Sequence, residues 1–129
     1  MKIKEVKIIF KTKKELGNIG EEIACKYLSN IGYLIKERNF CCRQGEIDII
    51  AKDKCEYVFI EVKTRSNICF GKPREGVDEY KKKHIYKSTR YYLHIHRLDN
   101  AFVRFDVIEI YLTNNKYKLK HLKQVDINY

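Results

Sequence analysis

Two acidic residues interrupt stretches that otherwise have the composition of β-strands. Asp48 lies between isoleucines in EIDII, and Glu61 lies between an isoleucine and a valine in FIEVK. Carboxylates are costly inside strands and are rarely buried without a compensating partner. Because side chains alternate across a strand, Glu61 and Lys63 project from the same face. The pattern therefore predicts a carboxylate and an ammonium group side by side.

The polar segment between these two stretches indicates how they meet. A hairpin centred between Lys54 and Cys55 sets Asp48 opposite Glu61. Opposed carboxylates repel each other, and a divalent cation bound by hard oxygen ligands is the usual means of keeping both ionised. We expect Asp48 and Glu61 to bind Mg2+ or Mn2+, with Lys63 screening the remaining charge.

Such a metal site suits the hydrolysis of phosphodiester bonds. The metal can polarise a phosphate oxygen and lower the pKa of the water that attacks phosphorus. Lys63 can orient that water or neutralise the developing charge. The structural alternative is a salt bridge between Glu61 and Lys63 on a strand surface, with Asp48 solvated. The residues by themselves favour the two interpretations equally.

Other charged residues have simpler interpretations. Glu21 and Glu22 lie on a predicted helix, and one of them could lean toward Asp48, although solvated helix-surface charges are the commoner case. Arg104 and Asp106 alternate within FVRFDVI, where an ion pair within or across strands is expected.

Basic residues gather near the start of a second predicted helix. They are Lys72, Arg74, Lys81, Lys82 and Lys83. Backbone N–H groups at a helix start also favour phosphate, so we assign these residues, together with Arg65, to nucleic-acid binding. A solvated cationic face is an equally good explanation.

The overall charge points to the same kind of partner. Twenty-seven Lys and Arg against seventeen Asp and Glu leave a formal net charge of +10 and a pI near 9.4. Such a field attracts phosphate polymers, so nucleic acid is the first partner to consider, ahead of acidic proteins or anionic lipid.

Length and composition bound the class of protein. The 129 residues fit one domain, 1–129, and no apolar run approaches the roughly 18 residues needed to cross a bilayer, so no membrane association is expected. Lysines interrupt the apolar stretch near the N-terminus, which argues against a secretory signal and predicts a cytoplasmic location. The five cysteines lack zinc-ligand spacing, which favours free thiols.

Hydrophobic periodicity predicts the elements that position these residues. From Glu15 to Ile31 apolar residues recur at helical spacing, and Gly32 ends the helix. The segments YLIKERNF, EIDIIAK and YVFIEVKTR predict a three-stranded meander, and FVRFDVIEIYL and YKLKHL predict one or two later strands. Pro73 opens a second helix that runs to about His96. The face predicted for that helix comprises Val77, Tyr80, His84, Ser88, Tyr91 and Ile95.

These motifs occur in an order that resembles one known family. The blocks GNIGEEIACKYLSNIGY, RNFCCRQGEIDIIAK, YVFIEVKTR, FGKPREGV and RFDVI, from about Leu16 to Ile110, are similar to those of the YraN family of bacterial endonuclease-like proteins. The blocks GEIDIIA and FIEVKTR are specific in combination. The resemblance implies an α/β, restriction-endonuclease-like αβββαβ core with a mixed sheet flanked by helices, similar to archaeal Holliday-junction resolvases.

The resemblance also implies roles for individual residues. The D…ExK site of such nucleases maps onto Asp48, Glu61 and Lys63. Glu21 matches the glutamate of the family's GExxA helix, which supports the metal site in similar resolvases, whereas Glu22 does not inherit that role. Asp106 matches the RFD block, without an assigned role. The core is expected at about 15–112, with 1–14 as an N-terminal extension.

Two functions follow as hypotheses. The first is a divalent-metal-dependent endonuclease acting on DNA, with branched or irregular structures as candidate substrates. The alternative is a non-catalytic nucleic-acid-binding module that keeps the nuclease fold and acts with a repair or recombination partner. An RNA-directed role is a weaker option, by analogy of fold. Junction cleavage would need two active sites and hence a symmetric homodimer.

Overall fold

The computed structural model describes residues 12–66, 79–113 and 116–127 of the chain. In order, its elements are α1 (Lys13–Asn30), β1 (Leu34–Cys42), β2 (Gly45–Asp53), β3 (Glu56–Ser66), α2 (Glu79–Ile95), β4 (Phe102–Thr113) and β5 (Lys116–Leu122). This α/β order confirms the prediction of a helix, three strands, a helix and further strands. The last two predicted segments form separate strands.

The five strands form one mixed sheet. Its order is β1-β2-β3-β4-β5, with β3 and β4 parallel and all other neighbours antiparallel. The three-stranded meander is therefore confirmed, and α2 makes the crossover that a parallel pair requires. Because β5 pairs with β4, the sheet extends to Leu122, beyond the core predicted at about 15–112.

Local sequence signals explain where α1 begins and ends. The Thr12 hydroxyl accepts a hydrogen bond from the Glu15 N–H at 3.1 Å, and the Glu15 carboxylate accepts one from the Thr12 N–H at 3.3 Å. This capping box satisfies two backbone donors that the helix itself leaves unpaired. After Ile31, Gly32 adopts a φ of +95°, which ends the helix as predicted.

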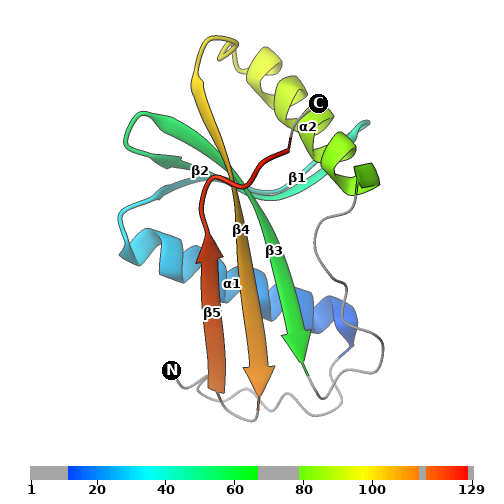
Figure 1. Cartoon of the computed structure of the whole chain (residues 1–129), viewed down its shortest axis with the longest axis vertical. Coiled ribbons are helices and arrows are strands. Elements are labelled where there is room, and N and C mark those ends of the chain that lie inside the picture. Colours follow the sequence, from blue (N-terminus) through cyan, green and yellow to red (C-terminus); the bar gives the residue numbers. More distant parts are fainter. Residues whose placement is uncertain (1–11, 67–78, 114–115, 128–129) are drawn as a thin grey trace.

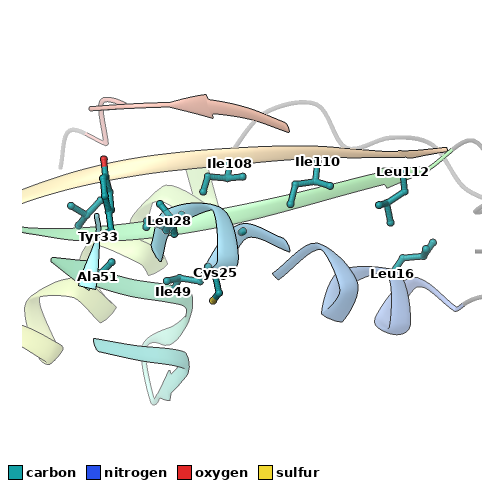
Figure 2. Packing of buried hydrophobic residues seen from close by; sticks show 12 residues of the cluster. Leu16, Cys25, Leu28, Tyr33, Ile49, Ala51, Ile108, Ile110 and Leu112 are labelled. Carbon is teal, nitrogen blue, oxygen red and sulfur yellow. The ribbon is translucent and has the colours of Figure 1, made fainter. Parts of the chain in front are cut away.

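Two apolar clusters lie on opposite faces of the sheet. On one face, α1 packs against the central strands, with Leu16, Cys25 and Leu28 directed toward Ile49, Ile108, Ile110 and Leu112 (Figure 2). On the other face, α2 lies over the end of the sheet opposite the C-terminal ends of β3 and β4 (Figure 1). The residues buried there are Phe40, Ile47, Ile50, Phe59, Ile85, Tyr92, Phe105 and Val107.

The face predicted for α2 is confirmed only in part: Ser88 is buried and His84 is half-buried, but the other described positions are exposed. Tyr80 is 74% exposed, Tyr91 and Ile95 are exposed as well, and Val77 lies outside the described residues. The buried positions are Ile85, Ser88, Thr89 and Tyr92. The Tyr92 ring makes edge contacts with Phe40 and Phe59, at centroid distances of 5.2 and 5.7 Å. These contacts across the sheet, which local spacing does not encode, set the rotation of the helix.

The remaining expectations concern thiols and membranes. Cys25, Cys41, Cys42 and Cys55 carry free thiols, and Cys69 lies outside the described residues. In the part of the chain that the structure describes, neither helix combines the length and apolar character needed to span a bilayer.

Candidate active site

The hairpin of β2 and β3 positions the predicted acidic pair. Its register runs from Asp53 opposite Glu56 to Ile49 opposite Ile60, and Asp48 and Glu61 are the next residues along the two strands. Lys54 occupies the turn with a φ of +56°. This is the register predicted from the polar turn.

The two carboxyl groups lie at the centre of the sheet and are held in place by the backbone. Glu61 is only 4% exposed. Asp48 Oδ2 accepts a hydrogen bond of 2.8 Å from the N–H of Val62, the residue that follows Glu61. This bond fixes the Asp48 carboxyl group beside the strand that carries its partner.

Burial raises the pKa of both carboxyl groups. It raises the pKa of Glu61 to about 7, with the Asp48 carboxylate adding to the shift and the Lys81 ammonium opposing it. Burial also raises the pKa of Asp48, and the Val62 N–H opposes that shift. A hydrogen bond between the two carboxyl groups raises the pKa of Glu61 and lowers that of Asp48. This hydrogen bond therefore favours protonation of Glu61 over protonation of Asp48.

Lys81 of α2 reaches this pair from above the sheet. Its Nζ forms an ion pair with Glu61 Oε1, although the Lys81 side chain remains 43% exposed. Lys81 was expected to bind nucleic acid, and the structure places its ammonium group on the acidic pair. Lys81 thus supplies a positive charge next to Glu61.

Lys63 follows Glu61 on the same face of β3, as strand alternation predicts. Burial lowers the pKa of its ammonium group, and the carboxylate of Glu109 on the neighbouring strand opposes that shift. A partly desolvated ammonium group beside two carboxyl groups is well suited to meet an anionic substrate.

Glu21 approaches the acidic pair from α1. Burial raises the pKa of Glu21, the nearby Asp48 carboxylate adds to the shift, and Arg38 and a hydrogen bond from Asn39 oppose it. One carboxylate oxygen, Oε1, is buried and makes no hydrogen bond. Its neighbour Glu22 is exposed and pairs with Arg38 at 2.9 Å. The structure therefore places the two glutamates in different surroundings.

The donor set suits a hard divalent cation. Asp48 and Glu61 can contribute carboxylate oxygens, and Mg2+ commonly binds through one or two carboxylates while water and substrate phosphate fill the other positions. Within residues 12–66, 79–113 and 116–127, no three His, Cys, Asp or Glu side chains are placed together to hold a metal. Glu21 lies near Asp48, and its unpaired buried oxygen is the kind of atom that a metal-bound water would satisfy.

The predicted nucleic-acid-binding residues divide into three groups. Arg65 lies on β3, 4.0 Å from Glu109 and 6.0 Å from the centre of the Tyr111 ring. Lys82 lies 3.7 Å from Glu79, and Lys83 is exposed. Lys72 and Arg74 lie outside the described residues.

Arg104 and Asp106 form the predicted ion pair on β4, with an Nε–Oδ1 distance of 2.9 Å. The pair belongs to a larger buried network. Asp106 is fully buried and also accepts hydrogen bonds from His121 at 2.7 Å and from the Gln124 N–H at 3.0 Å. This network lies on the α1 face of the sheet, whereas Glu61 and Lys63 lie on the α2 face.

Sequence reasoning missed two contributors to the site. Asn39 has a φ of +51°, a left-handed conformation that Asn tolerates, and it hydrogen-bonds to Glu21. The asparagine in RNF was a visible signal for such a position. The contact between Lys81 and Glu61 had no signal, because it joins residues of two separate elements.

The chain resembles known proteins over most of its length. A UPF0102 protein of Clostridium botulinum strain 657 is 49% identical over 113 residues, which cover 85% of this chain and 92% of the relative. A UPF0102 protein of Caldanaerobacter subterraneus subsp. tengcongensis is 44% identical over 113 residues, covering 88% and 93%. A family profile described as "Uncharacterised protein family UPF0102" matches residues 20–110, the range that holds Glu21, Asp48, Glu61 and Lys63. The chain therefore belongs to the UPF0102 family, as its resemblance to YraN proteins indicated.

Proposed function

We propose that this protein is a divalent-metal-dependent endonuclease that hydrolyses phosphodiester bonds in DNA. The observation that carries the proposal is the contact between Asp48 and the buried Glu61, with Lys63 on the same face of β3 as Glu61. Two carboxyl groups pressed together in the centre of a sheet reduce stability, and such an arrangement is expected where function requires it.

Each residue has a distinct task in this mechanism. Asp48 and Glu61 would hold Mg2+ or Mn2+, which when bound polarises a phosphate oxygen and acidifies an attacking water. Glu61 must first lose its proton and its contact with Lys81. Lys63 donates hydrogen bonds to the negative charge that develops on phosphate. Glu21, through its unpaired buried oxygen, orients water near Asp48.

A second candidate function is a binding module without turnover. The observation that favours it is the Lys81 ammonium group on Glu61, which already offsets one charge of the pair. In that case the protein would grip nucleic acid for a repair or recombination partner. Displacement of Lys81 from Glu61 by a metal would favour the endonuclease, and an undisturbed contact between Lys81 and Glu61 would favour the binding module.

Cleavage assays distinguish the two functions. Purified protein is incubated with linear, nicked, flapped and four-way DNA, and with structured RNA, in Mg2+ or Mn2+. We expect metal-dependent cutting of DNA that Asp48→Asn abolishes and that Lys63→Ala slows by about 100-fold or more. Lys63→Ala should retain most of the metal affinity, because an ammonium group is not a ligand.

Glu46→Gln is the matched control, because Glu46 is an exposed acidic residue on β2, the strand that carries Asp48. This variant should cut as the wild type does. Undiminished cutting by both Asp48→Asn and Lys63→Ala would place the activity elsewhere. DNA binding without cutting of any substrate would favour the binding module. Cutting of four-way DNA in paired positions would also require a homodimer, which sedimentation measures directly.

A further inference from the structure

The edge strand β5 carries three exposed lysines at alternate positions. These are Lys116, Lys118 and Lys120, in the sequence KYKLKHL. Alternate residues of a strand share one face, and their Cα atoms are about 6.8 Å apart. Three ammonium groups therefore stand in a row along the edge of the sheet.

The strand register identifies the face from which these lysines project. Tyr117 and Leu119 pack into the cluster beneath α1, so the intervening lysines point to the opposite face. Lys118 pairs with Tyr111 of β4, and Tyr111 pairs with Arg65 of β3. The β5 lysines thus share a face with Arg65, and with Lys63 and Glu61 on the same strand.

The register also gives the order of the groups across the sheet. One row contains Lys63, Glu109 and Lys120, and the next contains Arg65, Tyr111 and Lys118. With neighbouring strands about 4.8 Å apart, Lys120 lies about 10 Å from Lys63 at the backbone. The rows lead away from the Asp48–Glu61 pair toward the ends of β3 and β4.

This part of the sheet is open in the described structure. Tyr111 and Thr113 of β4 are exposed, like the three lysines beside them. The helix α2, which shares this face, lies over the other end of the sheet (Figure 1). Within the described ranges, none of the three lysines forms an ion pair, and the carboxylate of Glu109 pairs with Arg65. The local charge is therefore strongly positive.

We propose that the β5 lysines, with Lys63 and Arg65, form the surface along which the phosphate backbone of DNA runs to the Asp48–Glu61 pair. The inference rests on the proposed function for the identity of the ligand. It assigns the main DNA-binding surface to the part of the sheet face that α2 leaves uncovered and to residues 116–120. The lysines of α2 would contribute further contacts. Regularly spaced ammonium groups neutralise successive phosphates without reading the base sequence.

The test measures DNA binding apart from cleavage. Lys116, Lys118 and Lys120 are replaced by Gln in an Asp48→Asn background, and affinity for labelled duplex and four-way DNA is measured by fluorescence anisotropy across a salt series. We expect weaker binding to both, and a log–log salt slope that is smaller by about 2.7, or 0.9 for each lost phosphate contact. Circular dichroism and thermal melting confirm that the variant is folded.

The matched control replaces Lys13, Lys14 and Lys26 by Gln. These lysines are exposed on α1, on the other side of the sheet, and the change in net charge is identical. Glu109→Gln is a gain-of-binding variant: it removes the single carboxylate within the lysine rows and should tighten binding. The inference would be overturned if the β5 triple variant and the α1 triple variant lost DNA affinity equally. It would also be overturned if the wild type showed no salt-dependent DNA binding.

The outcomes separate this inference from the proposed function. If the β5 variant loses DNA affinity but the wild type cuts nothing, the surface stands and the endonuclease proposal fails. If the wild type cuts DNA and the β5 variant binds as tightly as the α1 control, the endonuclease proposal stands and this inference fails.

Discussion

At Glu61, a proton and the Lys81 ammonium group share the carboxylate that would bind a divalent metal under the proposed function. Burial holds the pKa of Glu61 at about 7, so the group is half protonated near neutral pH. Ionising two carboxyl groups so close together is energetically unfavourable unless a bound cation offsets their repulsion. Under the proposed function, the protonation state of Glu61 would therefore control metal binding, and a bound metal would displace Lys81.

This competition predicts a pH-dependent metal affinity. Below pH 7 the metal must displace the Glu61 proton, so affinity for Mg2+ or Mn2+ should be weak and should rise as pH increases through about 7. Binding near pH 6 should release close to one proton. Titration calorimetry in buffers of different ionisation enthalpy measures this release.

Glu61→Gln and Glu46→Gln serve as the comparison pair for that measurement. Glu61→Gln should lose both the metal binding and the proton release, whereas Glu46→Gln, at an exposed position, should keep both. A metal affinity that is flat between pH 5 and pH 8 in the wild type would contradict the shared-proton description of the pair.

Much of the site could be predicted from the sequence because its geometry is local. The spacing of Glu61 and Lys63 fixes their common face, and the polar turn at Lys54 fixes the register that brings Asp48 to Glu61. Lys81 could not be assigned in this way. Its position depends on how α2 crosses the sheet, which is set by tertiary packing.

At the scale of elements, the contact between α1 and β3 determines where Glu21 lies. A Cβ atom on Gly20 would lie 1.8 Å from the Thr64 hydroxyl oxygen and 2.9 Å from the Thr64 Cβ. Only a glycine permits this approach, so the glycine of the GExxA motif has a steric explanation. The close approach carries the next residue, Glu21, toward Asp48.

Gly20→Ala should therefore destabilise the protein and displace Glu21. Overpacking of this kind typically costs about 1–3 kcal/mol, measured as the change in the free energy of unfolding in urea. Adding Thr64→Ala removes the closest atom and should restore part of the loss. Gly17→Ala is the matched control, because a Cβ at Gly17 meets nothing within 4 Å. If Gly20→Ala and Gly17→Ala were equally stable, the prediction would be wrong, because α1 could then move away from Thr64 without a loss of stability.

The strands were predictable and the face of α2 was not, for one physical reason. Alternating or continuous apolar runs define β1 to β4 locally, whereas α2 carries tyrosines on several sides. Tyrosine is amphipathic and tolerates exposure, so helical spacing did not distinguish Tyr91 from Tyr92. The contacts of Tyr92 with Phe40 and Phe59 decide the outcome.

At the scale of the whole molecule, the Arg104–Asp106 network joins segments that are distant in sequence. Arg104 also pairs with Asp53 at 3.0 Å, and so contacts the β2–β3 hairpin. His121 connects Asp106 to Tyr27 of α1 through a hydrogen bond of 2.9 Å. The sequence predicted the pair within β4, because its members are two residues apart. The partners on α1 and β5 are set by the assembled fold.

The charge of Asp106 should stabilise this assembly most at neutral pH. Burial alone would raise its pKa, but hydrogen bonds from His121, Arg104 and the Gln124 N–H outweigh burial and lower the pKa below its usual value. A lowered carboxyl pKa contributes stability above the unfolded-state pKa of about 4, and this contribution is lost as pH falls through the lower, folded-state value.

Asp106→Asn should accordingly destabilise the protein by about 3 kcal/mol at pH 7, because it leaves the buried Arg104 guanidinium with weaker compensation. The difference from wild type should shrink as pH falls below the unfolded-state pKa of about 4 toward pH 3, because the unfolded carboxylate is then protonated and the native one loses its advantage. Urea unfolding at both pH values measures the two differences. Asp99→Asn is the control: Asp99 is exposed and lies 3.7 Å from the exposed His94 ring, so the substitution should cost little at either pH. DNA affinity at low temperature, where both proteins are folded, should be unchanged in Asp106→Asn, because the network lies on the face opposite the β5 lysines. A pH-independent loss would mean that Asp106 acts through packing and not through its charge.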